Sequence, residues 1–231
     1  VDLDKADGKV EVMPNPAAAL ELYRLAARNN VPVALYNVGI FYEAGRSVDQ
    51  DPAKAFAHFL QAAGGGLAPA MQKTGVYYLN GAGTLKDAVA ASGWFSRAAA
   101  AGSPEGLLSL GVMAESGLVG VGADSTPAKA ASDAYTQVIQ APQIADATRF
   151  EALLRLGGLH FRGVLVAAGS PPVPDYESAY RYFKQAELLA PDNELAKNTL
   201  KEAASKLTPE QTKKLDAAAE SAAARAAVAP P

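Results

Sequence analysis

The sequence contains no cysteine among its 231 residues. This absence excludes disulfide bonds, thiolate catalysis and metal sites built on cysteine. The chain also has no run of Lys or Arg, and its net charge is −3, so it lacks the basic footprint of proteins that bind nucleic acid or anionic membranes. No apolar stretch approaches the roughly 18 residues that a transmembrane helix needs.

Histidine is scarce, with only two residues, and no His-x-x-x-His or Glu-x-x-His spacing is present to hold a metal. His160 occupies a position that holds tyrosine elsewhere in the repeat described below, which favours a core ring over a catalytic or ligand role. We expect His58 on the surface.

Asp49-Gln50-Asp51 resembles part of a calcium loop, but the other ligands are missing, which favours a helix cap. Gly64-Gly65-Gly66 reads as a turn between helices, because no strand precedes it and no Lys-Ser/Thr follows.

What the sequence does contain is an internal repeat. Gly39 recurs 36 residues later as Gly75 and again as Gly111. The other matches at this spacing are Ala34 with Ala70, Tyr42 with Tyr78, Gly45 with Gly81 and Gly117, Asp51 with Asp87, Ala55 with Ala91, Phe59 with Phe95, and Gly66 with Gly102. A third unit starts at Ser103 and a fourth is centred on Gly157, while a half-unit with Tyr23 precedes the first. Periods of this size are typical of stacked helical repeats.

Each unit reads as two helices. The first helix ends at a glycine such as Gly45, and the second begins at Asp51-Pro52, a side-chain cap followed by proline. The glycine inside the first helix costs about 1 kcal/mol relative to alanine. We therefore expect a helix to cross closely there, with Ala55, Ala62 and Ala63 forming the matching thin surface and rings such as Phe59 filling the space between helices.

These residues resemble the Sel1-like repeat family, a relative of the tetratricopeptide repeats. The pattern Ala34…Gly39-x-x-Tyr42-x-x-Gly45…Asp51…Ala55…Phe59…Ala62-Ala63…Gly66 fits the family well, and residues 31–102 carry the strongest match. The resemblance implies an all-α fold, an α/α solenoid in which Sel1-like or tetratricopeptide-like helix pairs form a right-handed superhelix with a concave groove. It also implies scaffold or adaptor roles, often in bacterial envelope or signalling complexes.

We expect three segments along the chain. Residues 1–15 form an N-terminal extended segment, residues 16–190 a solenoid of about four repeats plus a leading half-repeat, and residues 191–231 a capping helix and an Ala-rich tail helix. The capping helix has Leu195, Leu200, Ala203 and Leu207 on one side. Whether the tail helix packs on the solenoid or contacts a partner stays open.

If the units stack like tetratricopeptides, the first helix of each unit lines the concave side. The positions three before, one after and four after the helix glycine then face inward. The predicted protein-binding groove comprises Tyr36, Ile40, Glu43, Gln72, Val76, Leu79, Leu108, Val112, Glu115, Leu154, Gly158 and Phe161. Apolar side chains exposed in a groove favour an extended peptide or a helix from another protein. The alternative is that these residues are core.

We predict a non-catalytic scaffold or adaptor that holds an unidentified protein or peptide, with no cofactor, metal, nucleic acid or membrane span. An accessory subunit of a bacterial envelope complex fits this function. The alternatives are an enzyme acting on carbohydrate or peptidoglycan, or its regulator, which would need a carboxylate pair in a cleft, and a structural spacer. The start at Val1 and the Ala/Pro-rich end favour a periplasmic or exported protein, with the cytoplasm as the alternative.

Overall fold

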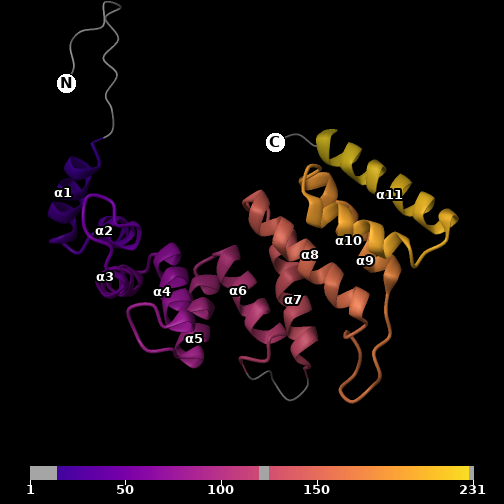
Figure 1. The fold of residues 1–231 in the computed structure, drawn as a ribbon, viewed down its shortest axis with the longest axis horizontal. Helices are drawn as coiled ribbons and strands as arrows, with labels where there is room; N and C mark the ends of the chain where they lie inside the picture. The colour runs from indigo at the N-terminus through magenta and orange to yellow at the C-terminus, as the bar shows by residue number, and fades with distance from the viewer. Residues whose placement is uncertain (1–14, 120–124, 229–231) are drawn as a thin grey trace, which may run out of the picture. The chain divides into compact units, whose positions relative to one another are not determined.

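The computed structural model describes residues 15–119 and 125–228, and every regular element in these ranges is an α-helix. The chain divides into two compact units, residues 1–97 and residues 98–231, and the division falls inside one helix. Figure 1 shows the helices of both units, coloured by residue number. Each unit is built from consecutive helices that pack on their neighbours.

Unit 1 contains the leading half-repeat and the first two helix pairs. Its helices are α1 (Pro16–Ala27), α2 (Pro32–Ala44), α3 (Pro52–Gly64), α4 (Ala68–Asn80) and most of α5 (Ala88–Ala100). Contacts join α1 to α2, α2 to α3 and α3 to α4. Each first helix therefore packs on the second helix before it as well as on the one after it.

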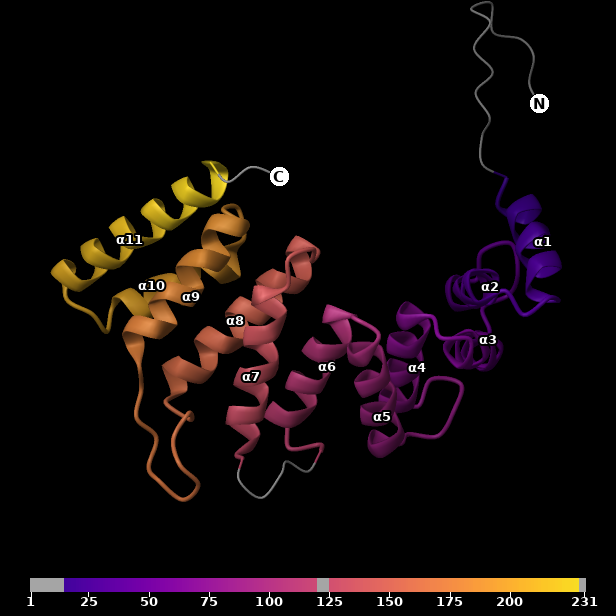
Figure 2. The ribbon, with the colours of Figure 1, turned by 180° about the vertical axis from the view of Figure 1, so that it is seen from behind.

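Unit 2 contains two further helix pairs and the tail. Its helices are α6 (Pro104–Glu115), α7 (Pro127–Gln140), α8 (Asp146–Arg162), α9 (Tyr176–Leu189), α10 (Glu194–Ala204) and α11 (Pro209–Val228). Each helix from α6 to α9 packs on the next, and α11 lies against α9 (Figure 2). The predicted fold class, an all-α solenoid of helix pairs, is confirmed.

Side chains at the predicted positions begin the helices. The Asp51 carboxylate accepts the Lys54 N–H at 2.9 Å, which confirms the helix cap. Thr208 and Gln211 form a reciprocal capping box, in which the Thr208 N–H donates to Gln211 Oε1 at 2.8 Å and the Gln211 N–H donates to Thr208 Oγ1 at 3.3 Å. The first helices end at glycines: Gly45 and Gly81 have left-handed φ values of 63° and 72°. This backbone conformation would be strained for a residue with a side chain.

The glycine inside each first helix faces an aromatic ring of the second helix in the same repeat. A Cβ atom added to Gly39 would lie 2.6 Å from a ring carbon of Phe59, and one added to Gly157 would lie 2.6 Å from Phe183. The same contact joins Gly75 to Phe95 and Gly111 to Tyr135. The predicted close approach is right, because only a hydrogen fits beside the ring.

The alanines predicted to meet Gly39 are not its nearest neighbours, because the three nearest atoms all belong to Phe59. Ala62 and Ala63 instead belong to a core cluster with Leu35 and Ala70. Ala62 and Ala63 of α3 thus pack with Leu35 of α2 in the same repeat and with Ala70 of α4 in the following one. The rings fill the space beside the helix glycines.

The two tail helices differ from expectation in one respect. Leu195 is 57% exposed, whereas Ala196 and Ala203 are fully buried, so Leu195 does not lie on the packed side of α10 as predicted. Leu195 is exposed because its neighbour Ala196 occupies the buried position in the first turn of α10. The open question about α11 is answered for its described side chains, since Leu215 is buried against α9 in a cluster with Ala179 and Tyr180.

The predicted N-terminal segment lies outside the described residues except for Asn15. That residue caps α1, because its Oδ1 accepts the Ala17 N–H at 3.0 Å. Among the described residues, the first helix begins at Pro16, the residue at which the solenoid was predicted to start.

A candidate protein-binding groove along α8

The predicted groove residues of unit 1 take part in packing between its helices. The ring of Tyr36 lies 5.5 Å from the ring of Phe59, and Ile40 packs on the same cluster. The remaining apolar and amide members are half-buried side chains of α4: Gln72, Val76 and Leu79. These residues are partly accessible, and none of them lines the three cavities described below.

Glu43, the acidic member in unit 1, is engaged by two side chains of α4. Its carboxylate oxygens lie 2.9 and 2.7 Å from Lys73 Nζ, and the hydroxyl of Tyr77 donates to it at 3.1 Å. Burial, and then the nearby Glu43 carboxylate, raise the pKa of Tyr77, so its hydroxyl remains a donor at neutral pH. Glu43 therefore stabilises the contact between α2 and α4.

In unit 2 one predicted groove residue is in the core. Leu108 is 8% exposed and belongs to a cluster with Tyr135 and Ala152, because its position on α6 faces α7 and α8. Its prediction as an accessible groove residue is wrong for that reason. Val112 packs at the edge of the same cluster, and Phe161 packs edge-on against Tyr176 with ring centroids 5.3 Å apart.

A cavity of about 600 Å³ opens along α8, and we call it the α8 groove. Its lining comprises Glu115 of α6, Leu195 and Thr199 of α10, and from α8 itself Ala147, Phe150, Glu151, Leu154, Arg155, Gly158 and Arg162. The α8 members recur at helical spacing along one face of the helix. The groove brings together three of the residues that the sequence predicted, namely Glu115, Leu154 and Gly158.

Charged side chains form one wall of the α8 groove. Arg162 Nη2 lies 2.6 Å from one carboxylate oxygen of Glu115, and Arg155 Nη1 lies 3.4 Å from the other. Arg155 also donates to Glu151 at 2.9 Å. The hydroxyl of Tyr135 donates to Glu115 at 2.8 Å, and burial together with this hydrogen bond raises its pKa.

The apolar part of the groove consists of Phe150, Leu154 and Leu195. Phe150 and Leu154 are half-buried, and Leu195 exposes more than half of its surface. Gly158 lies between Leu154 and Arg162 along this face of α8. A Cβ atom added to Gly158 would meet, among the described residues, only the flexible end of Arg162, at 3.3 Å.

Sequence reasoning missed Phe150, Arg155 and Arg162, since it considered three positions in each first helix. α8 has 17 residues, four more than α2 or α4, so its exposed face offers more positions. The doublet Gly157-Gly158 was an available signal. The ring of Phe183 explains Gly157, whereas Gly158 has no such contact among the residues that the structure describes.

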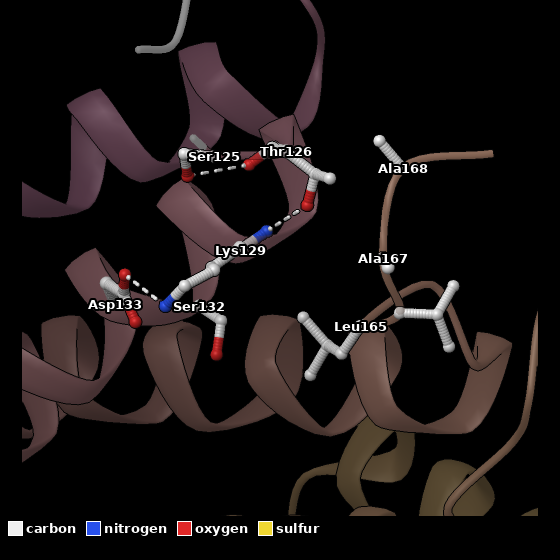
Figure 3. A pocket seen from close by; sticks show the side chains of 9 residues that line it. Ser125, Thr126, Lys129, Ser132, Asp133, Leu165, Ala167 and Ala168 are labelled. Atoms are coloured by element: carbon white, nitrogen blue, oxygen red, sulfur yellow. Dashed lines mark hydrogen bonds and ion pairs between the residues drawn. The ribbon is translucent and has the colours of Figure 1, made fainter. Parts of the chain in front are cut away.

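A second cavity of about 550 Å³ lies at the start of α7 (Figure 3). Most of its polar side chains already have a partner. Lys129 Nζ pairs with Asp133 at 3.2 Å, and the Thr126 hydroxyl accepts the Lys129 N–H at 3.1 Å. This cavity therefore offers less free hydrogen-bonding capacity than the α8 groove.

The two histidines are structural. His160 is half-buried, 5.4 Å from the ring of Tyr182, and its Nδ1 lies 3.3 Å from Asp175, as expected for a ring that replaces tyrosine. His58 contradicts the surface prediction, because it stacks on Tyr42 with ring centroids 5.7 Å apart. Burial, and then the charge of Arg24, lower the pKa of His58.

Within residues 15–119 and 125–228, no group of three or more acidic or histidine side chains is placed to hold a metal ion. None of the helices in the same ranges has the length and apolar character needed to cross a membrane. The α8 groove therefore remains the candidate site.

The family model of the Sel1 repeat matches residues 6–31, 32–67, 68–103 and 150–190, which is more than half of the chain. The chain belongs to the Sel1 repeat family. Sel1 repeats generally mediate protein interactions. The helix pair α6–α7 falls outside the matched stretches, yet Gly111 packs on Tyr135 as the other helix glycines pack on their rings, so this pair is a repeat as well.

Two solved structures of Sel1-type proteins are similar. The Sel1 repeat protein from Oxalobacter formigenes shares 26% identity over 90% of this chain and 80% of that one, with a TM-score of 0.66. The protective antigen c5321 of uropathogenic Escherichia coli, which displays an SLR fold, shares 17% identity over 90% of this chain and 56% of that one, with a TM-score of 0.51. The second likeness concerns the fold alone. No curated protein matches the chain in sequence.

Proposed function

We propose that this chain is a non-catalytic binding protein whose α8 groove holds a segment of another protein. The observation that carries the proposal is an accessible apolar surface, made by Phe150, Leu154 and Leu195, beside two arginines on the exposed face of a first helix. Apolar surface next to arginine is typical of protein-binding sites.

The dimensions of the groove suit a peptide segment. Its lining runs from Ala147 to Arg162, which corresponds to about 22 Å along a helix. An extended peptide covers that length with about seven residues. A cavity of about 600 Å³ accommodates several side chains of such a segment without a change in the helices around it.

The carboxylates in the groove support binding over catalysis. Glycoside hydrolysis requires two carboxyl groups that are free to act on the substrate. Glu115 and Glu151, the two that line the groove, are both ion-paired with arginines and hold its wall. Membership of an envelope complex and export from the cytoplasm stay predictions from the sequence.

Site-specific crosslinking in cells tests the proposal. A photo-crosslinking amino acid at position 199, in place of Thr199, is expected to capture one partner, and Leu195→Glu in the same chain is expected to abolish the capture. The matched control places the crosslinker at position 133, in place of the exposed Asp133, which lines the other cavity. Equal capture at both positions, or capture unaffected by Leu195→Glu while circular dichroism stays helical, contradicts the proposal.

A further inference from the structure

We infer that the partner of the α8 groove is an extended, internal segment with an acidic side chain on Arg162 and a large apolar side chain on Leu154. The main chain of this segment lies close over Gly158. The inference rests on the proposed function and specifies the chemistry of the partner. Three properties of the groove support it, namely its unused hydrogen-bond donors, its bare floor and its continuation beyond α8.

The unused polar capacity of the groove consists of donors on Arg162. The side chain of Arg162 is 52% exposed, and its one partner among the described residues is Glu115. A guanidinium has five N–H donors, so most of those on Arg162 remain free. Arg155, in contrast, contacts both Glu115 and Glu151.

The two carboxylates in the groove are already engaged by side chains of the chain itself. Glu115 accepts hydrogen bonds from Tyr135, Arg155 and Arg162, so the two arginines already pair with its negative charge. Glu151 is engaged by Arg155. The Thr199 hydroxyl donates its one proton to the backbone oxygen of Leu195 at 2.9 Å, so it has no donor left for a ligand. A ligand therefore gains most by bringing an acceptor to Arg162, and a carboxylate matches a guanidinium in charge and shape.

The floor of the groove is bare at one residue. Gly158 costs its helix about 1 kcal/mol relative to alanine, and no described neighbour except the end of Arg162 would meet a Cβ atom there. The corresponding positions of the earlier repeats hold Ile40, Val76 and Val112. Repeat four alone thus leaves room for a main chain to approach a first helix closely.

The spacing of the groove sets the spacing of the ligand. Eight residues of α8 separate Leu154 from Arg162, which is about 12 Å along the helix. An extended chain advances about 3.3 Å per residue and alternates its side chains between two faces. The acidic and apolar residues that both face α8 are therefore four positions apart.

The groove continues beyond Arg162. A neighbouring cavity of about 410 Å³ shares Glu115 and Arg162 and extends along Leu159, Val164 and Pro172. A bound segment can run on past Arg162 into this cavity. The carboxylate is for that reason assigned to an Asp or Glu side chain inside the segment, and not to a chain terminus.

A display library of random short peptides, selected on the purified chain, tests the inference. We expect enriched peptides to carry Asp or Glu four positions from Leu, Ile, Met or Phe. Binding of one synthetic enriched peptide should weaken about tenfold or more in Arg162→Gln, because a charge-assisted pair is lost. Gly158→Ala should weaken it as well, while the variant unfolds at a slightly higher denaturant concentration. Lys129→Gln, a matched loss of one positive charge at the other cavity, should leave binding unchanged.

A charge exchange provides a second readout. Arg162→Glu should lose the acidic peptide and should bind a peptide in which Lys replaces the acid. Enriched peptides that require Leu195 but carry no acid would overturn the inference and leave the proposed function standing. The absence of enrichment, or binding indifferent to both Leu195→Glu and Arg162→Gln, would overturn both.

Discussion

Glu43 of α2 and Lys73 of α4 form an ion pair in which Nζ lies 2.9 and 2.7 Å from the two carboxylate oxygens. Glu115 of α6 and Arg155 of α8 stand at the same positions relative to their helix glycines, and they lie 3.4 Å apart. In each unit, a glutamate and a basic residue at equivalent positions thus join two consecutive first helices.

The pair between Glu43 and Lys73 should stabilise unit 1 measurably. Because their side chains are 31% and 29% exposed, solvent screens the pair only in part. We expect a double-mutant cycle of Glu43→Ala and Lys73→Ala, measured by urea denaturation, to give a coupling energy of about 1 kcal/mol. The control cycle on Lys129 and Asp133, which are both about 60% exposed, should give about 0.3–0.5 kcal/mol. Equal coupling in the two cycles would contradict the structural role of the first pair.

Adjacent glycines in α8 should respond to alanine in opposite directions. Gly157→Ala places a Cβ atom 2.6 Å from the ring of Phe183, so we expect a loss of about 1–3 kcal/mol from overpacking. Gly158→Ala meets only the end of Arg162 and should stabilise the helix by up to about 1 kcal/mol. Urea denaturation of the two variants measures both effects. Destabilisation by Gly158→Ala would show that other residues of the chain pack against Gly158.

The ring of Phe59 should be one of the largest single contributions to unit 1. It is fully buried and lies against Gly39. We expect Phe59→Ala to cost about 3–5 kcal/mol in urea denaturation, because the cavity under the ring cannot close without moving α2. Leu22→Ala serves as the control, since Leu22 is 69% exposed and should change stability by less than about 0.5 kcal/mol. A cost below about 1 kcal/mol for Phe59→Ala would contradict the packing of Gly39 on the ring.

The repeat could be predicted from the sequence because local signals and packing agree. Caps such as Asp51, terminal glycines such as Gly45 and the recurring ring of Phe59 each specify a helix boundary or a buried face on their own. Their recurrence at a fixed spacing then specifies which faces meet. The fold follows from short-range rules applied several times.

The site was harder to predict, because it depends on where the repeat is irregular. The positions taken from an ideal repeat include Leu108, which is buried, and omit Arg162, which lies five positions after its helix glycine. The longer α8 and the exposed Leu195 at the start of α10 create the groove, and neither follows from the period. A rule for equivalent positions finds the face of α8 that lines the groove, and it misses the residues that make one repeat different.

His58 should make stability depend on pH in mildly acidic solution. Burial, followed by the charge of Arg24, lowers the pKa of folded His58, so the unfolded chain binds the proton first as pH falls below about 6.5. The stability contributed by neutral His58 is complete above that pH and is lost as pH falls towards the lowered pKa. We expect His58→Phe, which keeps a ring on Tyr42, to reduce the change in urea midpoint between pH about 7.5 and about 5. An unchanged pH dependence would show that His58 is as hydrated when folded as when unfolded.

The docking of α11 should depend on one leucine and one tyrosine. Leu215 is buried against α9, and the hydroxyl of Tyr180 donates to Asp216 at 2.8 Å. Burial, together with this hydrogen bond, raises the pKa of Tyr180 to about 12, so the hydroxyl remains a donor at neutral pH. Since little else in the first half of α11 is buried, Leu215→Ser should release the helix without unfolding α9.

Hydrogen exchange separates local release from global loss of stability. Amides of residues 212–219 should lose protection in Leu215→Ser and lose part of it in Tyr180→Phe, whereas amides of α8 should exchange at their original rate. Lys213→Ser is the control, because Lys213 is exposed on the same helix. Faster exchange in α8 as well would mean that α11 supports the whole of unit 2, and the binding experiments on the α8 groove would then require the complete tail.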